Sequence, residues 1–115
     1  MNVEEFRDYC LSLVATSESF PFDKKTLVFK VLNKMFALVD IDTFQYVNLK
    51  CDPEKAIELR EKYTCVQPGY HMNKKHWNSV YFDGSVSDDL IKEWIKHSYD
   101  LVVSKLPKKV QAEML

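Results

Sequence analysis

The stretch Tyr63–Phe82 reads YTCVQPGYHMNKKHWNSVYF, and the rest of the chain is organised around it. It holds one of the two tryptophans, one of the two glycines and two of the three histidines of the protein. No Asp or Glu occurs from Lys62 through Phe82, although the 115-residue chain has 17 acidic residues. The polar and aromatic groups that are able to bind a ligand are therefore concentrated here.

A turn, a strand, a loop and a second strand are predicted within this stretch. Pro68-Gly69 fits a type II turn, because proline presets φ at the first central position and glycine tolerates positive φ at the second. We expect residues 70–72 to extend and the polar residues 73–76 to form a loop. Residues 78–82 are rich in β-branched and aromatic side chains and are predicted to return as a strand.

This hairpin has two interpretations. In the first, its lysines are simply solvated and Trp77 packs into the core, as is usual for lysine in a loop. In the second, the tip from Asn73 to Trp77 is a wing that binds a ligand. The residues alone leave both interpretations open.

Length and composition favour one ordinary globular domain over residues 1–115. Hydrophobic residues make up 46% and charged residues 29% of the chain, which is typical of such domains. The net charge of -1 argues against a uniformly basic nucleic-acid-binding protein, so any anion binding must come from local patches. We expect a monomer.

The cysteines and the N-terminus indicate the compartment. Cys10, Cys51 and Cys65 are odd in number and show no pairing pattern, so we expect reduced, buried thiols. The N-terminal MNVEEF lacks the basic and apolar regions of a signal peptide, and no stretch approaches 18 apolar residues. We therefore predict a cytoplasmic protein without a membrane partner.

The remaining chain shows the periodicities of helices and strands. Helices are predicted from Asn2 to Val14, with an Asn2–Glu5 capping box, from Asp52-Pro53 to about residue 63, and from Ser87 to Lys105. Residues 16–25 are predicted to be a loop, and residues 108–115 a tail with one or two helical turns. Strands are predicted at Thr26–Val31, Met35–Ile41 and Phe44–Cys51, with Asn33 able to take positive φ in the first connection. The order α-β-β-β-α-β-β-α predicts an α+β domain in which helices cover an antiparallel sheet.

Three segments resemble the MmcQ/YjbR family of small bacterial proteins. They are TLVFKVLNKMFALVDI at residues 26–41, PGYHMNKKHWNSV at residues 68–80 and WIKHSYDLVVSKLPKK at residues 94–109. The resemblance implies a two-layer fold similar to that of CyaY, the bacterial frataxin, and a double-wing DNA-binding motif. This chain has Leu32-Asn33-Lys34 at the first hairpin turn, where we would expect a turn that contains glycine.

Lysines are gathered in acid-free stretches at residues 24–39, 62–82 and 101–112. If these stretches converge, they form a basic face on a nearly neutral protein. Lysine contacts to phosphates give affinity without much base readout, and only two arginines are present for reading guanine. We therefore predict weak, largely sequence-independent and non-enzymatic binding to duplex DNA. The candidate residues are Lys24, Lys25, Lys30, Lys34, His71, Asn73, Lys74, Lys75, His76 and Trp77.

Other functions are possible for the same residues. Tyr70, Trp77 and Tyr81 are candidates for an aromatic patch that anchors a protein partner. A Cys65–His71 pair is a conceivable activated thiolate, but there is no oxyanion loop or glycine-rich phosphate loop beside it, and we expect no catalysis.

Metal and cofactor sites are not predicted. The acidic residues at the helix starts are explained by capping and by the helix dipole, and the histidines and cysteines lack the spacing of metal ligands. These acidic residues are Glu4, Glu5, Asp8, Asp88 and Asp89.

Overall fold

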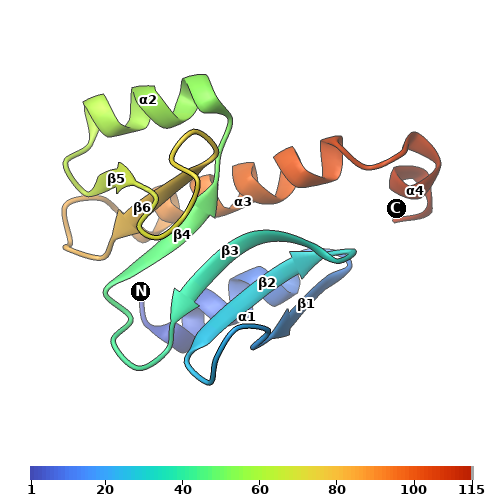
Figure 1. Ribbon diagram of the computed structural model, residues 1–115, viewed down its shortest axis with the longest axis horizontal. Coiled ribbons are helices and arrows are strands. Elements are labelled where there is room, and N and C mark those ends of the chain that lie inside the picture. The colour runs from blue at the N-terminus through green and yellow to red at the C-terminus, as the bar shows by residue number, and fades with distance from the viewer. Residues whose placement is uncertain (115) are drawn as a thin grey trace.

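The computed structural model describes residues 1–114, which form a six-stranded antiparallel sheet and four helices (Figure 1). The sheet order is β1-β2-β3-β4-β6-β5, and the α+β class predicted from the sequence is confirmed. Leu115, the end of the predicted tail, lies outside the described residues. The helices are α1 (Val3–Ser12), α2 (Pro53–Lys62), α3 (Asp88–Ser104) and α4 (Lys108–Glu113). The strands are β1 (Thr16–Ser19), β2 (Thr26–Val31), β3 (Lys34–Asp40), β4 (Tyr46–Lys50), β5 (Val66–Pro68) and β6 (Trp77–Tyr81).

The helices begin where their capping residues predict. Asn2, Asp52 and Ser87 each accept a hydrogen bond from the backbone N–H three residues on. Such a bond satisfies one of the free donors at a helix start and typically contributes about 1 kcal/mol.

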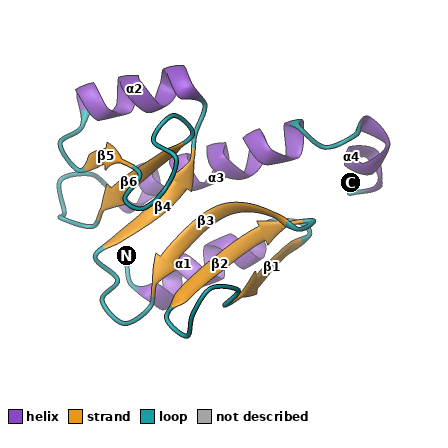
Figure 2. Cartoon of the chain, in the orientation of Figure 1, coloured by secondary structure: helices purple, strands orange, loops and turns teal. Residues whose placement is uncertain are grey.

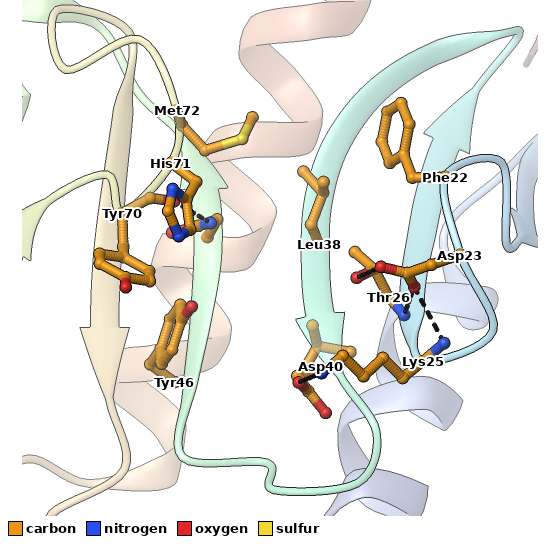
Figure 3. A pocket seen from close by; sticks show the side chains of 12 residues that line it. Phe22, Asp23, Lys25, Thr26, Leu38, Asp40, Tyr46, Tyr70, His71 and Met72 are labelled. Carbon is orange, nitrogen blue, oxygen red and sulfur yellow. Dashed lines mark hydrogen bonds and ion pairs between the residues drawn. The ribbon is translucent and has the colours of Figure 1, made fainter.

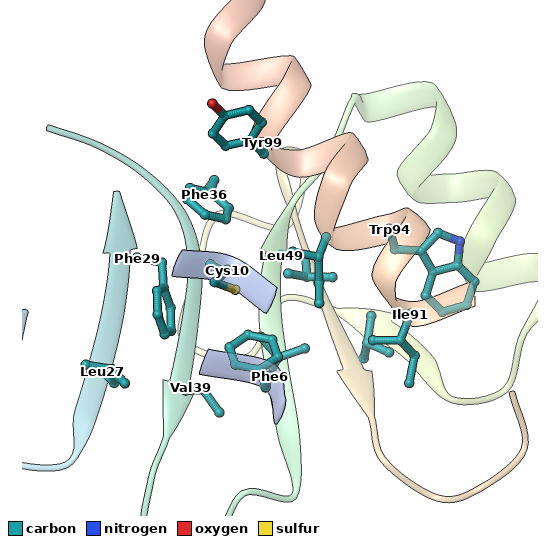
Figure 4. Close-up of a cluster of buried hydrophobic side chains, with 14 of the residues drawn as sticks. Phe6, Cys10, Leu27, Phe29, Phe36, Val39, Leu49, Ile91, Trp94 and Tyr99 are labelled. Atoms are coloured by element: carbon teal, nitrogen blue, oxygen red, sulfur yellow. The ribbon is translucent and has the colours of Figure 1, made fainter. Parts of the chain in front are cut away.

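The main core lies between one face of the sheet and the helices α1 and α3 (Figure 4). Phe6 of α1 is 0% exposed, and its ring makes an edge contact with Phe29 of β2 at 5.5 Å between ring centroids. Trp94 and Tyr99 of α3 complete this core farther along the sheet. Helix α2 packs beside it, against β5 and β6, as seen at the top of Figure 2.

The opposite face of the sheet carries a smaller apolar cluster. Val28, Leu38 and Trp77 are buried there, with Met35 and Met72 packed against them. No helix element packs over this cluster in residues 1–114, so we call this side the open face. Both tryptophans of the protein are buried, at 4% exposed for Trp77 and 6% for Trp94.

The predicted loop at residues 16–25 was partly wrong, because Thr16–Ser19 forms the edge strand β1. Its sequence Thr-Ser-Glu-Ser has no alternation of apolar and polar residues, so periodicity did not identify it. Pairing with β2 holds the strand, and the carboxylate of Glu18 accepts two hydrogen bonds from Arg7 Nε at 2.7 and 2.9 Å.

The first hairpin turn uses positive φ at two residues, Leu32 at 45° and Asn33 at 70°. Positive φ at both central residues is the signature of the type I′ turn, whose twist matches that of a two-residue hairpin. The prediction for Asn33 is confirmed. Leu32 occupies the position where glycine would be least strained, which explains the expectation of a glycine in this turn.

The central hairpin was predicted only in part. Residues 70–72 are not a strand, and β5 ends at Pro68. The type II turn at Pro68-Gly69 is wrong, because Gly84 is the one glycine with positive φ. Gly69 is instead required for close packing, since a Cβ there would lie 2.8 Å from Cβ of Trp77 and 2.9 Å from its carbonyl oxygen.

Candidate nucleic-acid interface

The loop from Gly69 to His76, which we call the β5–β6 loop, folds back over the open face instead of projecting as an extended wing. A ring of hydrogen bonds docks it on the sheet. Tyr70 N donates to Ser79 Oγ at 2.9 Å, Ser79 Oγ donates to Asn48 Oδ1 at 2.5 Å, and Asn48 Nδ2 donates to Tyr70 O at 3.1 Å. Asn48 on β4 and Ser79 on β6 are paired across the two strands, and both are buried. The ring of hydrogen bonds therefore gives partners to polar side-chain atoms that water does not reach.

Arg60 of α2 fixes the other end of the loop. Its Nε donates to Asn78 Oδ1 at 2.7 Å, and its terminal nitrogen donates to Lys74 O and to Trp77 O. The guanidinium therefore joins α2, the start of β6 and the loop through one planar group. This role of Arg60 is not evident from the sequence, because its acceptors are 14 to 18 residues away.

A cavity of about 540 Å³ lies on the open face, between the β1–β2 loop and the β5–β6 loop (Figure 3). We call it the sheet-face groove. Two strongly exposed aromatic residues border it, Phe22 at 64% and Tyr70 at 53%. The ring of Tyr70 contacts those of His71 and Tyr46 at 4.0 and 6.0 Å between centroids.

The sheet-face groove is not basic. Lys25, which is predicted to contact DNA, lines this groove, but its ammonium lies 4.0 Å from the carboxylate of Asp40. Backbone N–H groups of Thr26 and Lys25 lower the pKa of Asp23, which keeps a second negative charge in the lining. This cavity therefore favours apolar or aromatic groups over phosphate.

A second cavity, of about 530 Å³, lies at the end of the sheet, and we call it the sheet-end pocket. It forms where the β2–β3 turn, the end of β4, the end of the β5–β6 loop and the last turns of α3 meet. Its cationic and polar residues are Lys34, Lys50, Asp52, His76 and Lys105, and its apolar residues are Met35, Cys51, Pro53, Trp77, Leu101, Val102 and Leu106.

The ammonium groups of the sheet-end pocket are available for a ligand. Within residues 1–114, the ion pairs made by lysines involve Lys25 and Lys96 and none from this lining. Asp52 is the one carboxylate among the described lining residues, and it caps α2 by accepting from Lys55 N at 3.2 Å. The pocket thus carries a surplus of positive charge on a nearly neutral protein.

The predicted site residues are divided among different places. Lys34, His76 and Trp77 meet in the sheet-end pocket, although Trp77 is buried and belongs to its floor. Lys74 Nζ donates to Gly69 O at 2.8 Å and so closes its own loop. The other predicted residues lie elsewhere. Lys25 and His71 line the sheet-face groove, and Asn73 accepts hydrogen bonds from the backbone of the turn that follows it. Lys24, Lys30 and Lys75 line neither cavity.

Two lysines of the pocket, Lys50 and Lys105, were not among the predicted contacts. Lys105 belongs to the third acid-free stretch, so its convergence with Lys34 and His76 is the arrangement that this charge pattern suggested. Lys50 lies two residues after Asn48 on β4 and therefore on the same face of the sheet, which is a signal for the open face that charge counting overlooked.

The structure does not bring the conceivable Cys65–His71 pair together. Cys65 belongs to the core under the helices, whereas His71 lines the groove on the open face. Among residues 1–114, no group of three His, Cys, Asp or Glu side chains is arranged to hold a metal ion. Nor does this part of the chain include a helix whose length and apolar character would carry it across a bilayer.

His97 of α3 lies behind the pocket, beside Cys51 and Leu59. Its Nε2 is buried and has no hydrogen-bond partner among the described residues. Burial, aided by the positive charge of Lys55, lowers the pKa of His97, while Asp52 and Asp100 oppose the shift.

We expect this histidine to make the protein less stable in mild acid. Because the pKa is lower in the folded state, the unfolded chain binds the proton more tightly, and stability falls as the pH drops through about 6.5 and on through the folded pKa. Urea unfolding between pH 8 and pH 5 measures the effect. A His97→Phe variant should have a flatter profile over this range, and an unchanged profile would contradict the assignment.

A protein-family model described as YjbR matches residues 11–101 of the chain. Among curated proteins, the chain is 38% identical over 109 residues to YbdF of Escherichia coli O157:H7, covering 94% of this chain and 89% of that protein. It is 36% identical over 110 residues to YjbR of Escherichia coli strain K12, covering 95% and 93%. Both relatives are described as uncharacterized.

Solved structures show the same fold. The crystal structure of DR2400 from Deinococcus radiodurans matches with a TM-score of 0.91 and 43% identity, covering 98% of this chain and 87% of that one. A crystal structure from Pseudomonas syringae matches with a TM-score of 0.72 and 30% identity, covering 88% and 98%.

Proposed function

We propose that this chain, which belongs to the YjbR family, is a non-enzymatic protein that binds the phosphate backbone of duplex DNA weakly. We place it in the cytoplasm as a monomer. The observation that carries the proposal is the sheet-end pocket, where lysines from distant parts of the chain form one positively charged rim.

The rim suits phosphate more than base recognition. Lys34, Lys50 and Lys105 end in flexible ammonium groups, which bind phosphates as point charges and carry no code for base edges. Duplex DNA presents one negative charge per about 1.7 Å of its axis, so a rim of this size meets several phosphates at once.

Salt dependence is the first test. With about three phosphates contacted, log K should fall against log salt with a slope of about -3. Fluorescence anisotropy with a labelled 20-base-pair duplex should therefore detect binding at about 20 mM salt and lose it near physiological salt. No binding at the low-salt end would end the proposal.

Charge reversal at the rim is the second test. Lys34→Glu with Lys105→Glu should weaken duplex binding at least about tenfold for all sequences alike and should bring the salt slope toward about -1. The matched control reverses Lys62 and Lys92, which lie outside the pocket but change the net charge equally. Equal losses in both double variants would mean that net charge, and not the pocket, is responsible.

A second candidate function is supported by the sheet-face groove. Phe22 and Tyr70 are exposed on opposite sides of a cavity that has an apolar floor and no surplus of positive charge. Exposed aromatic residues around a cavity are typical anchors for a partner protein. In this case a pull-down should depend on Phe22 and Tyr70, and the charge reversals at the sheet-end pocket should have no effect on it.

A further inference from the structure

The sheet-end pocket has a charged part and an apolar part in its lining, and the backbone of a DNA duplex would contact only the charged part. The lysine rim suits phosphates, but the floor is made of Met35, Trp77, Leu101, Val102 and Leu106. A phosphate placed on this floor would lose hydration without gaining a partner. A ligand that satisfies both parts must combine an anionic group with a flat apolar one.

We propose that the sheet-end pocket receives one unpaired nucleobase of a nucleic-acid strand, while the flanking phosphates lie on Lys34, Lys50 and Lys105. This inference rests on the proposed binding of nucleic acid and names the form of it that the pocket prefers. The cavity of about 530 Å³ is within the range of small-molecule sites, which is about 300–1,000 Å³.

The interior is suited to a base in its chemistry. Trp77 is 4% exposed and the ammonium of Lys50 lies 5.1 Å from its ring centroid, so the surface that meets a base comes from the aliphatic side chains of the floor, with a cation beside it. Burial raises the pKa of Cys51 to about 11, which leaves its thiol neutral at pH 7 and adds no negative charge against the strand. Aromatic and apolar side chains with a cationic rim are the usual elements of single-strand binding sites.

The position of the pocket is also suited to a displaced base. It opens at the end of the sheet, between the β2–β3 turn and the last turns of α3, rather than on a flat surface. The main chain of the β5–β6 loop is held there by the hydrogen bond from Arg60 to Lys74 O and by the hydrogen bond from Cys51 N to His76 O at 2.8 Å. The cavity is therefore preformed, and little ordering is needed when a base enters.

The experiment compares strands that differ only in their bases. A labelled single-stranded 12-mer of thymidine, a 12-mer abasic strand of the same charge, and thymidine monophosphate alone are titrated at about 20 mM salt, where phosphate contacts are strong. We expect the thymidine strand to bind about tenfold more tightly than the abasic strand, because one base would bury its apolar surface on the floor of the pocket. Equal affinities would overturn the inference. Mononucleotide binding as tight as that of the strand would overturn it in favour of a free nucleotide.

A pocket-filling variant separates this inference from the proposed function. Leu101→Trp should abolish the difference between the thymidine and abasic strands and leave duplex affinity within about twofold, because the lysines remain. The control is Val103→Trp, on the same helix but beside a different cavity. A tenfold preference that persists in Leu101→Trp overturns the inference. If duplex DNA binds but single strands show no base preference, the inference is wrong and the proposed function stands. If no strand binds at all, both the inference and the proposed function are wrong.

Discussion

Replacing Phe6 with alanine is expected to lower the free energy of unfolding by about 4 kcal/mol, a large part of the total stability of a domain of this size. Phe6 is 0% exposed, and its ring makes edge contacts with Phe29, Phe44 and Phe82 at 5.5, 5.9 and 6.5 Å between centroids. Its removal leaves a cavity in the place where α1, β2 and the loops at the end of the sheet meet. Urea denaturation followed by tryptophan fluorescence measures the loss.

The control for this prediction is Phe22→Ala. Phe22 is 64% exposed, so the same chemical change should cost less than about 0.5 kcal/mol. If the two variants lose similar stability, Phe6 is not part of the buried core as described.

Replacing Arg60 with leucine is expected to cost about 3 kcal/mol and to free the β5–β6 loop. Leucine keeps the apolar contacts of the side chain but leaves Asn78 Oδ1 without its donor, whereas Trp77 O still accepts from Gly69 N at 2.9 Å. Asn78 is 2% exposed, so water does not replace the lost hydrogen bond, and an unsatisfied buried group costs about 1–3 kcal/mol. Urea denaturation gives the cost, and amide hydrogen exchange shows whether residues 73–76 open more often.

Arg60→Lys makes the test specific. Lysine keeps the charge but lacks the planar fork, so we expect it to recover less than half of the lost stability. The neighbouring change Lys62→Met, at an exposed position of the same helix, should be nearly neutral. Unchanged exchange of the loop in Arg60→Leu would show that Arg60 does not hold it.

The parts of the fold that sequence reasoning predicted depend on local chemistry. The capping residues Asn2, Asp52 and Ser87 determine helix starts within one turn, and a run rich in Val, Phe and Leu identifies β2 to its ends. The parts that it missed depend on distant partners. Thr16–Ser19 is a strand because β2 pairs with it, and residues 70–72 leave the sheet because Asn48 and Ser79 bind Tyr70.

The candidate site was predictable to the same extent. Acid-free stretches pointed to Lys34, His76 and Trp77, which meet in the sheet-end pocket. The same pattern did not distinguish them from Lys25, which is paired with Asp40, or from Lys74, which binds its own loop. Which lysines meet in one pocket, and which have their charge neutralised by a partner, depends on the tertiary structure. The order of charges along the chain does not determine it.

The two edge strands of the sheet, β1 and β5, affect how the protein aggregates at high concentration. β1 is four residues long and polar, with Glu18 held by Arg7, and β5 is three residues long and ends at Pro68, which has no N–H to offer. Short strands, charge and proline at sheet edges hinder the addition of a strand from another molecule. Growth of fibrils by strand addition to the folded state is therefore disfavoured at both edges of the sheet.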